Sequence, residues 1–444
     1  MSRCGMFFRF VVPSVMAFAL SGVYTIVDGF FVGNSLGDSG LAAVNLGFPV
    51  SAFMQAVGTG IGLSGAIRFA ILRGQEKEKE AGTCFCDTVL LLAAVSALLT
   101  LVTLAALPGL LGLLGAQGEL YGLTAAYVRV IALGTFFQVF ATGLVPFIRN
   151  LGGASFAMCS MIAGFAANIF LDYLFVWRLG QGMAGAAWAT VIGQAVTMAA
   201  TVFYLVKKRV GFHIPGARTA CADGARILKV ALAPFGLTFS PQITTILMNR
   251  FLAVSEGEQA VAVYGCIAYI TAITYLLLQG VGDGGQPLIS RYYGEGDLAA
   301  MRQMRRYAYL TSLGIALVCM AGFWLARDGV GVLFGASRET SRSVGIYLPL
   351  YLAALVFLSY VRITTAFLYA TERSALSYLL VYAEPAAIFL LLLLLPNLAG
   401  LGPLGIWIAV PAAQLAVWVL ALFVRRRADR TIFPPGRSWE DAEL

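Results

Sequence analysis

Apolar stretches of about 20 residues or more recur along almost the whole chain, and this is the length that a helix needs to cross a bilayer. Of the 444 residues, 59% are hydrophobic and 12% are charged, whereas a soluble domain is about 25% charged. A soluble globule of this length would need far more polar surface. The sequence therefore predicts an all-α polytopic membrane protein.

We expect twelve membrane-spanning helices. Their approximate ranges are 9–36, 42–72, 84–107, 120–148, 154–177, 184–207, 226–253, 260–290, 304–326, 343–371, 374–397 and 402–425. The opening "MSRCGMFFRFVVPSVMAFAL" has one property of a signal peptide, because Ala17 and Ala19 form a small-x-small pair after an apolar stretch. The apolar run continues past this pair and more spans follow, which favours a first membrane span.

The distribution of lysine and arginine predicts the orientation of the chain. With the N-terminus inside, the inner loops collect Arg73, Lys77, Lys79, Lys207, Lys208, Arg209, Arg218, Arg302, Arg305, Arg306 and the tail "VRRRADR". One outer loop is an exception, since it carries Arg327, Arg338 and Arg342. Asp328 and Glu339 offset this charge only in part. The net charge of +8 therefore indicates topology and contact with anionic lipid, and not nucleic-acid binding.

No metal, cofactor or nucleotide site is predicted beyond a possible Na⁺ ion. The seven cysteines have no spacing typical of a zinc site or a disulfide framework: Cys4, Cys84, Cys86, Cys159, Cys221, Cys266 and Cys319. The single histidine, His213, lies in an expected inner loop, where a solvated role is favoured over a ligand role. "GIGLSG" at 60–65 lies inside an apolar helix, so it predicts close helix packing and not a dinucleotide site.

The second half of the chain repeats the first. A shift of 220 residues places "GMAGAAWATVIGQAV" at 182–196 over "GPLGIWIAVPAAQLA" at 402–416, and Gln194 over Gln414. Six spans in each copy keep both copies in one orientation, which predicts a parallel repeat of two six-helix lobes. Such repeats are known in secondary transporters, with the substrate path between the halves. We expect an N-lobe at 1–210, a cytoplasmic linker at 211–225, a C-lobe at 226–425 and a basic cytoplasmic tail at 426–444.

Four polar residues of the first half are lost or neutralised in the second. The repeat aligns Asp28 with Asn249, Asn168 with Ile388, Asp172 with Leu392 and Thr190 with Val410. If the six-helix unit itself needed these acids, the second copy should also keep them. Their asymmetry favours a function over an architectural role.

Asp28, Asp172 and Thr190 are expected at a similar depth, roughly 12, 8 and 10 Å below the outer ends of their spans at 1.5 Å per residue. Desolvation and like charge both favour the protonated form of two neighbouring carboxylates. Such a pair can take up and release a proton, or bind a cation with the oxygens of Asn168 and Thr190. The alternative is that satisfied hydrogen bonds simply hold three helices together.

Several motifs, in this order and spacing, resemble a known family. They are "IVDGFFVGNSLGDSGLAAVNLGFP" in span 1, "NIFLDYLFV" and "GMAGAAWATV" in spans 5 and 6, and "QPLISRYYGEGD" after span 8. Over about residues 9–425 the chain is similar to the multidrug and toxic compound extrusion (MATE) family, in a bacterial branch. The resemblance implies a twelve-helix, two-lobed antiporter of the bacterial inner membrane that expels organic cations in exchange for H⁺ or Na⁺. It places the N-lobe ion site of the family on Asp28, Asn168, Asp172 and Thr190.

The second lobe departs from the pattern of the family. Some branches carry a coupling acid in span 7, where this chain offers only Ser240, Gln242 and Asn249. Arg362 in span 10 and Glu384 in span 11 lie about equally far from the turn that joins their spans. We expect a structural ion pair between them, with a substrate contact by Glu384 as the alternative.

Two further expectations concern the interior of the spans. The residues expected to line a substrate cavity are Gln55, Gln242, Asn249, Gln279 and Glu384. Asp283 lies near the inner end of span 8, where snorkelling or helix packing is favoured over coupling.

The leading hypothesis is a monomeric antiporter, without a cofactor, that exports organic drugs or metabolites of cationic or amphipathic character. A lipid-linked oligosaccharide or lipid flippase of the same wider superfamily would be expected to have many cationic residues in its cavity. Here the charges within spans are few and include Asp28, Asp172 and Glu384. A membrane enzyme would need a set of nucleophile, base or metal ligands that the sequence does not offer. A channel fits poorly with a two-lobed repeat whose acids lie on one side.

The topology generates a first test. Lys77, Lys208 and the tail after Val424 should face the cytoplasm, while Glu119 and Glu258 should face outward. Single cysteines at these positions, in a cysteine-free background, should react with an impermeant reagent only at the two outward positions in intact cells. Labelling of position 208 from outside would overturn the orientation.

Overall fold

The computed structural model of the chain describes residues 2–211, 213, 217–333, 337–398 and 401–433, without the side chains of 38, 217–222, 328 and 330–333. These residues are almost entirely helical and include no strand. Within them, eleven helices are long and apolar enough to cross a membrane, or twelve if one bent pair is a single span. The predicted all-α polytopic class is confirmed.

The chain divides into two compact units, Met1–Phe239 (unit 1) and Ser240–Leu444 (unit 2). The division falls within α8 (Ala217–Ser255). The segment expected as a linker at 211–225 is helical from Ala217 onward, and the expected tail continues α13 (Leu404–Ile432). Asp429 supports this extension of α13, because it pairs with Arg305 of α10 (Leu298–Leu333) and with Arg425 one turn earlier. Residues 434–444 of the expected tail lie outside the described residues.

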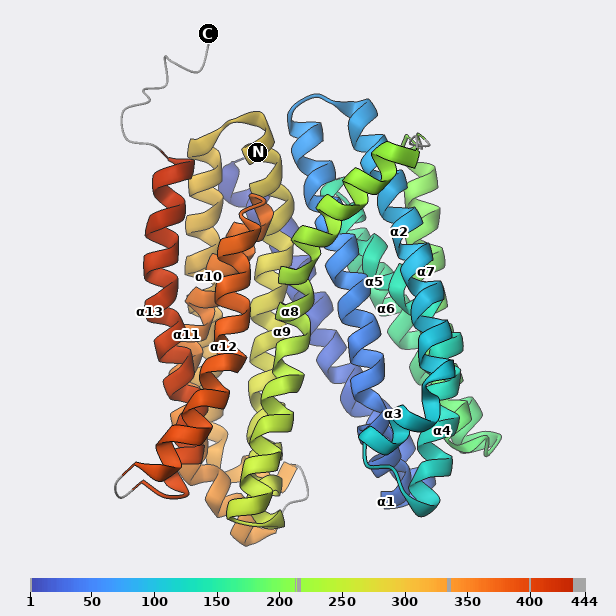
Figure 1. Cartoon of the computed structure of the whole chain (residues 1–444), viewed down its shortest axis with the longest axis vertical. Coiled ribbons are helices and arrows are strands. Elements are labelled where there is room, and N and C mark those ends of the chain that lie inside the picture. Colours follow the sequence, from blue (N-terminus) through green and yellow to red (C-terminus); the bar gives the residue numbers. More distant parts are fainter. Residues whose placement is uncertain (1, 212, 214–216, 334–336, 399–400, 434–444) are drawn as a thin grey trace. The chain divides into compact units, whose positions relative to one another are not determined.

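In unit 1 the long helix α1 packs along α2, α4, α5 and α6, and α6 packs along α7 (Figure 1). The elements are α1 (Arg3–Gly74), α2 (Glu78–Ala105), α3 (Leu107–Leu113), α4 (Gly118–Leu133), α5 (Thr135–Asn150), α6 (Ala154–Asp172), the π-helix η1 (Tyr173–Arg178) and α7 (Gly182–Lys207). Part of the core consists of three phenylalanine rings, in which Phe147 meets Phe69 and Phe85 edge to face at 5.5 and 5.0 Å.

Two glycines mark breaks in the helices of unit 1. At Gly37 the backbone has φ 63° and ψ −158°, which breaks α1 into two spans, Arg3–Gly37 and Ser39–Gly74. This conformation favours glycine because it has no Cβ. The predicted span 120–148 is bent by 55° between α4 and α5. The bend lies at Gly134, where an added Cβ would collide with Val191 of α7.

In unit 2, α9, α10 and α11 pack against one another, and α13 packs against α11 and α12 (Figure 1). The elements are α9 (Glu258–Glu295), α10 (Leu298–Leu333), α11 (Arg338–Ala370), α12 (Ser374–Leu394), the 3₁₀ turn η2 (Leu395–Asn397) and α13 (Leu404–Ile432). Trp407 is fully buried in this core, where its ring stacks on Tyr347 at 4.1 Å and its indole N–H donates to Glu256 at 2.7 Å.

The contact between α6 and α7 depends on glycine, and this can be tested. A Cβ on Gly193 would lie 2.8 Å from the carbonyl oxygen of Gly164 and 3.0 Å from Cβ of Asn168. Gly193→Ala should therefore force the helices apart and lower the free energy of unfolding by about 1–3 kcal/mol, measured as a lower Tm in detergent. Gly122→Ala is the control, because Gly122 is an exposed helical glycine with open space beside it. Equal Tm values for both variants would contradict the close contact.

Candidate functional site

The candidate site of unit 1 centres on two aspartates. Asp172, the last residue of α6, is fully buried, and Asp28 in the first span of α1 is half-buried. Their carboxyl groups lie within hydrogen-bonding reach of each other. An ionised carboxylate has no donor, so the two can share a hydrogen bond only when one of them carries a proton. The structure thus brings together the two acids that the repeat comparison selected.

Three buried oxygens at this site receive no hydrogen bond from an N–H or hydroxyl group of the described residues. They are both carboxyl oxygens of Asp172 and Oδ1 of Asn168. The amide group of Asn168 donates instead to Thr190 Oγ1 at 3.4 Å, and the Thr190 hydroxyl donates to the Ala186 carbonyl at 3.1 Å. An unsatisfied buried polar atom costs about 1–3 kcal/mol. A bound proton or a cation with oxygen ligands would remove this cost.

Helix packing explains why these side chains meet. Asn168 and Asp172 are four residues apart in α6, so they lie on the same helix face. Gly164, one turn before Asn168, lies against Gly193 of α7 at backbone contact distance. Thr190 is three residues before Gly193, and the close contact therefore brings its hydroxyl to Asn168. Small residues allow this approach of helices within membranes.

Asp172 also lies where α6 changes its winding. The π-helix Tyr173–Arg178 begins at the next residue. Within it the Leu179 N–H donates to the Leu174 carbonyl at 2.9 Å, which is the wider i→i+5 bond. Such π-helical turns are rare and are frequently found at functional sites. The sequence predicted a regular helix through this segment.

Two tyrosines that were not predicted from the sequence lie beside the acids. Tyr24, one turn before Asp28, is hydrogen-bonded to Thr190, and its ring stacks on Phe165 at 4.9 Å. Tyr127 of α4 lies close enough to both aspartates for electrostatic interaction, with its ring against Gly47. The spacing of four residues between Tyr24 and Asp28 indicates that both lie on one helix face, so Tyr24 could have been predicted. Nothing in the sequence connected Tyr127 to the pair, because span 4 holds no unusual polar pattern.

A second buried acid in unit 1 was also missed. Asp87 of α2 is 3% exposed, and neither of its carboxyl oxygens has a hydrogen-bond partner among the described residues. An isolated ionised carboxylate is very costly in such a place. A proton or a bound cation would offset this cost. Its signal was a single acid in an otherwise apolar span.

In unit 2, side chains from four helices form a polar cluster in place of an acid pair. Arg362 of α11 is buried and lies over the ring of Tyr275 of α9 at 4.8 Å. Gln414 of α13 donates to the Tyr275 hydroxyl at 2.7 Å. Glu384 of α12 is hydrogen-bonded to Gln414 and Tyr275 and is attracted electrostatically by Arg362. The acid of this cluster is therefore held by several partners, unlike Asp172.

The remaining predicted residues are divided between the units. Gln55 is exposed in unit 1, while Gln242, Asn249 and Gln279 are half-buried in unit 2. Their gathering into one substrate cavity stays a prediction. Asp283 is buried in α9 and accepts a hydrogen bond from Tyr369 at 3.3 Å, which fits helix packing. Six cysteines are free, and the side chain of Cys221 and that of Arg218 lie outside the described residues.

Similarity to known proteins covers most of the chain. The MatE family profile matches residues 13–174 and 230–384. The multidrug export protein MepA of Staphylococcus saprophyticus is 25% identical over 428 residues, covering 95% of this chain and 93% of that protein. MepA of Staphylococcus aureus strain N315 is 25% identical over 426 residues, with the same coverage.

Two solved structures are similar over nearly their whole length. An MOP superfamily transporter from Pyrococcus furiosus, described as having a binding pocket of reverse polarity that suggests a different function, has a TM-score of 0.90 at 25% identity and covers 97% of both chains. The outward-facing conformation of a multidrug resistance MATE family transporter has a TM-score of 0.89 at 25% identity and covers 96% of both chains.

The cluster of unit 2 generates a test of the expected pair. Arg362→Met strands Glu384 and Glu384→Gln strands Arg362, and removing one partner of a buried pair costs about 3–5 kcal/mol. Each single variant should therefore lower the Tm in detergent more than the double variant does. Arg306→Met, at an exposed arginine of the same unit, should leave the Tm unchanged. Additive losses would mean that the two side chains act independently, and would favour a substrate contact for Glu384.

Proposed function

This chain belongs to the MatE family of membrane transporters, as its motifs predicted, and from that premise we propose that it exports organic cationic or amphipathic compounds in exchange for H⁺ or Na⁺. Members of this family are transporters and not enzymes. The proposed location is the bacterial inner membrane, with both termini in the cytoplasm and the monomer as the working unit. We propose alternating access as the transport cycle, without a cofactor.

One observation supports the coupling proposal, namely the pair of Asp28 and Asp172. Both oxygens of Asp172, and Oδ1 of Asn168 beside them, are buried without an N–H or hydroxyl donor among the described residues. If the proton that the two carboxyl groups share were removed, the site would be left with uncompensated negative charge in a low-dielectric region. A proton is sufficient to neutralise it, and Na⁺ is an alternative because carboxylate, amide and hydroxyl oxygens surround the same place. Asn168 and Thr190 would be the neutral ligands in that second case.

The pair also has the property that coupling requires. A driving ion shifts a conformational equilibrium only if its affinity differs between the two conformations. A small movement between α1 and α6 changes the separation of Asp28 and Asp172, and this changes the free energy of placing a cation between them. Neutralisation of the pair would then favour release of an organic cation. Tyr24 belongs to the same device, since its hydrogen bond to Thr190 links α1 to α7.

The direct experiment uses purified protein in vesicles with a fluorescent organic cation. H⁺ and Na⁺ gradients are imposed separately. Uptake against a substrate gradient under either one supports antiport, and the gradient that drives it identifies the ion. Failure of transport under both, with translocation of a labelled lipid instead, would favour the flippase.

Substitution at the pair tests which residues couple. Asp28→Asn and Asp172→Asn should each abolish gradient-driven efflux, because amides keep the shape of the site but cannot release a proton or hold a cation by charge. Expression and Tm should stay close to the parent values. Asn249→Ala, at the equivalent place in the second repeat, is the control and should have much less effect. Transport at the parental rate by Asp172→Asn would assign this acid to the architecture.

A further inference from the structure

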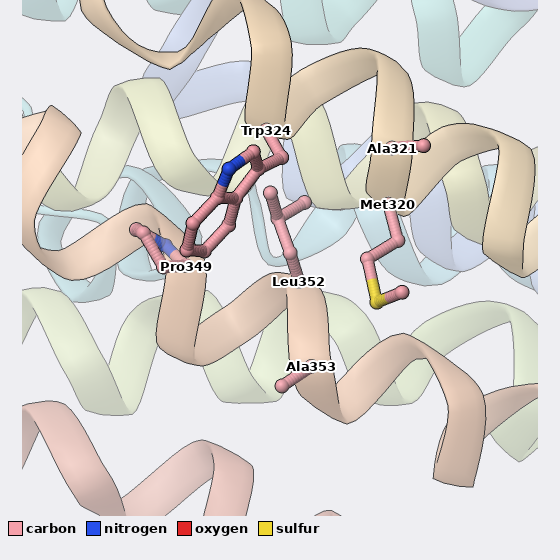
Figure 2. Close-up of a pocket in the computed structure, with 6 residues that line it drawn as sticks. All are labelled: Met320, Ala321, Trp324, Pro349, Leu352 and Ala353. Carbon is pink, nitrogen blue, oxygen red and sulfur yellow. The ribbon is translucent and has the colours of Figure 1, made fainter.

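A pocket lies between α10 and α11 of unit 2. Its lining consists of Met320, Ala321, Trp324, Pro349, Leu352 and Ala353. Trp324 and Met320 point from α10 toward α11, and Leu352 points back toward α10 (Figure 2). The space measures about 230 Å³, which is smaller than a typical small-molecule pocket but far larger than a methyl-sized packing defect. Apart from the indole N–H, every lining side chain is apolar.

The pocket lies near the C-terminal end of α10. The predicted span 304–326 ends just before Arg327, and Trp324 precedes this arginine by one helical turn. The guanidinium of Arg327 lies over the Trp324 ring at 4.8 Å. Tryptophan is enriched at the level of lipid headgroups, and arginine keeps its charge at the interface while its stem covers apolar surface. An apolar space thus adjoins a fixed positive charge where hydrocarbon meets headgroups.

The surface around the pocket consists of exposed apolar side chains. Leu325 and Ile346, near this end of the two helices, are 84% and 65% exposed. Ala321 and Ala353 are exposed as well, and their small side chains leave the pocket open between the helices. The space is therefore open to whatever apolar molecule lies beside α10 and α11.

We propose that this pocket binds an anionic phospholipid, with one acyl chain between α10 and α11 and the phosphate at the guanidinium of Arg327. A phosphate accepts two parallel hydrogen bonds from the guanidinium fork, and an acyl chain matches the lining of Met320, Trp324 and Leu352. An organic cation would be repelled by Arg327, and a neutral apolar molecule would gain nothing from it.

The lipid site also accounts for the arginines of one predicted outer loop. Arg327 belongs to the loop that departs from the distribution of lysine and arginine in the rest of the chain. Arg338 and Arg342, in the first turns of α11, are exposed at the same end of the helix pair. A lipid phosphate would be attracted by this positive charge, which Asp328 and Glu339 offset only in part. The proposed lipid site does not depend on which ion drives transport.

Fluorescence quenching by brominated lipids tests the site directly. The protein is reconstituted in dioleoylphosphatidylcholine vesicles with increasing fractions of brominated phosphatidylglycerol or brominated phosphatidylcholine. The chain has six tryptophans, so the signal of Trp324 is the difference between the parent and Trp324→Phe. Brominated phosphatidylglycerol should quench this signal at a mole fraction about fivefold lower than brominated phosphatidylcholine, the factor that corresponds to about 1 kcal/mol per arginine at a membrane surface.

Two variants separate the charge from the pocket. Arg327→Gln should remove the preference for phosphatidylglycerol, and Ala321→Phe should reduce quenching by both lipids because it fills the space. Arg306→Gln, the same change at an exposed position toward the other end of α10, should keep the preference. Equal quenching by the two lipids in the parent, or an unchanged preference in Arg327→Gln, would overturn the proposal.

Discussion

A hydrocarbon environment supplies no hydrogen-bond partners, and this constraint determines most features of the chain. Backbone groups must be satisfied within the segment, so the spans are helices. Side chains face the same shortage, so each buried polar group depends on a neighbouring helix. Gly164 and Gly193 bring α6 and α7 into backbone contact, and only at that distance does Asn168 reach Thr190. The meeting of Asn168 and Thr190 in the candidate site follows from this one glycine contact.

Glu384 of unit 2 and Asp172 of unit 1 have different surroundings. In unit 2, Glu384 is held by Gln414 and Tyr275 and attracted by Arg362. In unit 1, Asp172 has no N–H or hydroxyl donor among the described residues, and it faces a second acid, Asp28. An acid with its own hydrogen-bond donors stabilises one arrangement, whereas a pair of acids without donors among the described residues depends on a cation from outside the protein. This difference is the physical basis for assigning coupling to the first repeat and structural support to the second.

Much of the fold and the centre of the site could be predicted from the sequence. Long apolar runs identified the spans, and the repeat selected Asp28, Asn168, Asp172 and Thr190 by what the second copy lacks. The bend at Gly134 and the π-helix after Asp172 could not be predicted, because both depend on contacts with distant helices. Tyr127 was missed for the same reason. Asp87 was visible as an acid in an apolar span, but only its burial without a partner indicates that it matters.

The central claim is that a driving cation and an organic cation compete through Asp28 and Asp172. Equilibrium binding of a fluorescent organic cation to the detergent-solubilised protein, across a range of pH and Na⁺ concentration, measures this most directly. Because linkage is reciprocal, the affinity should fall as the concentration of H⁺ or Na⁺ rises, and the Asp172→Asn protein should lose that dependence. An affinity that is insensitive to both ions, or equally sensitive in Asp172→Asn, would contradict the account.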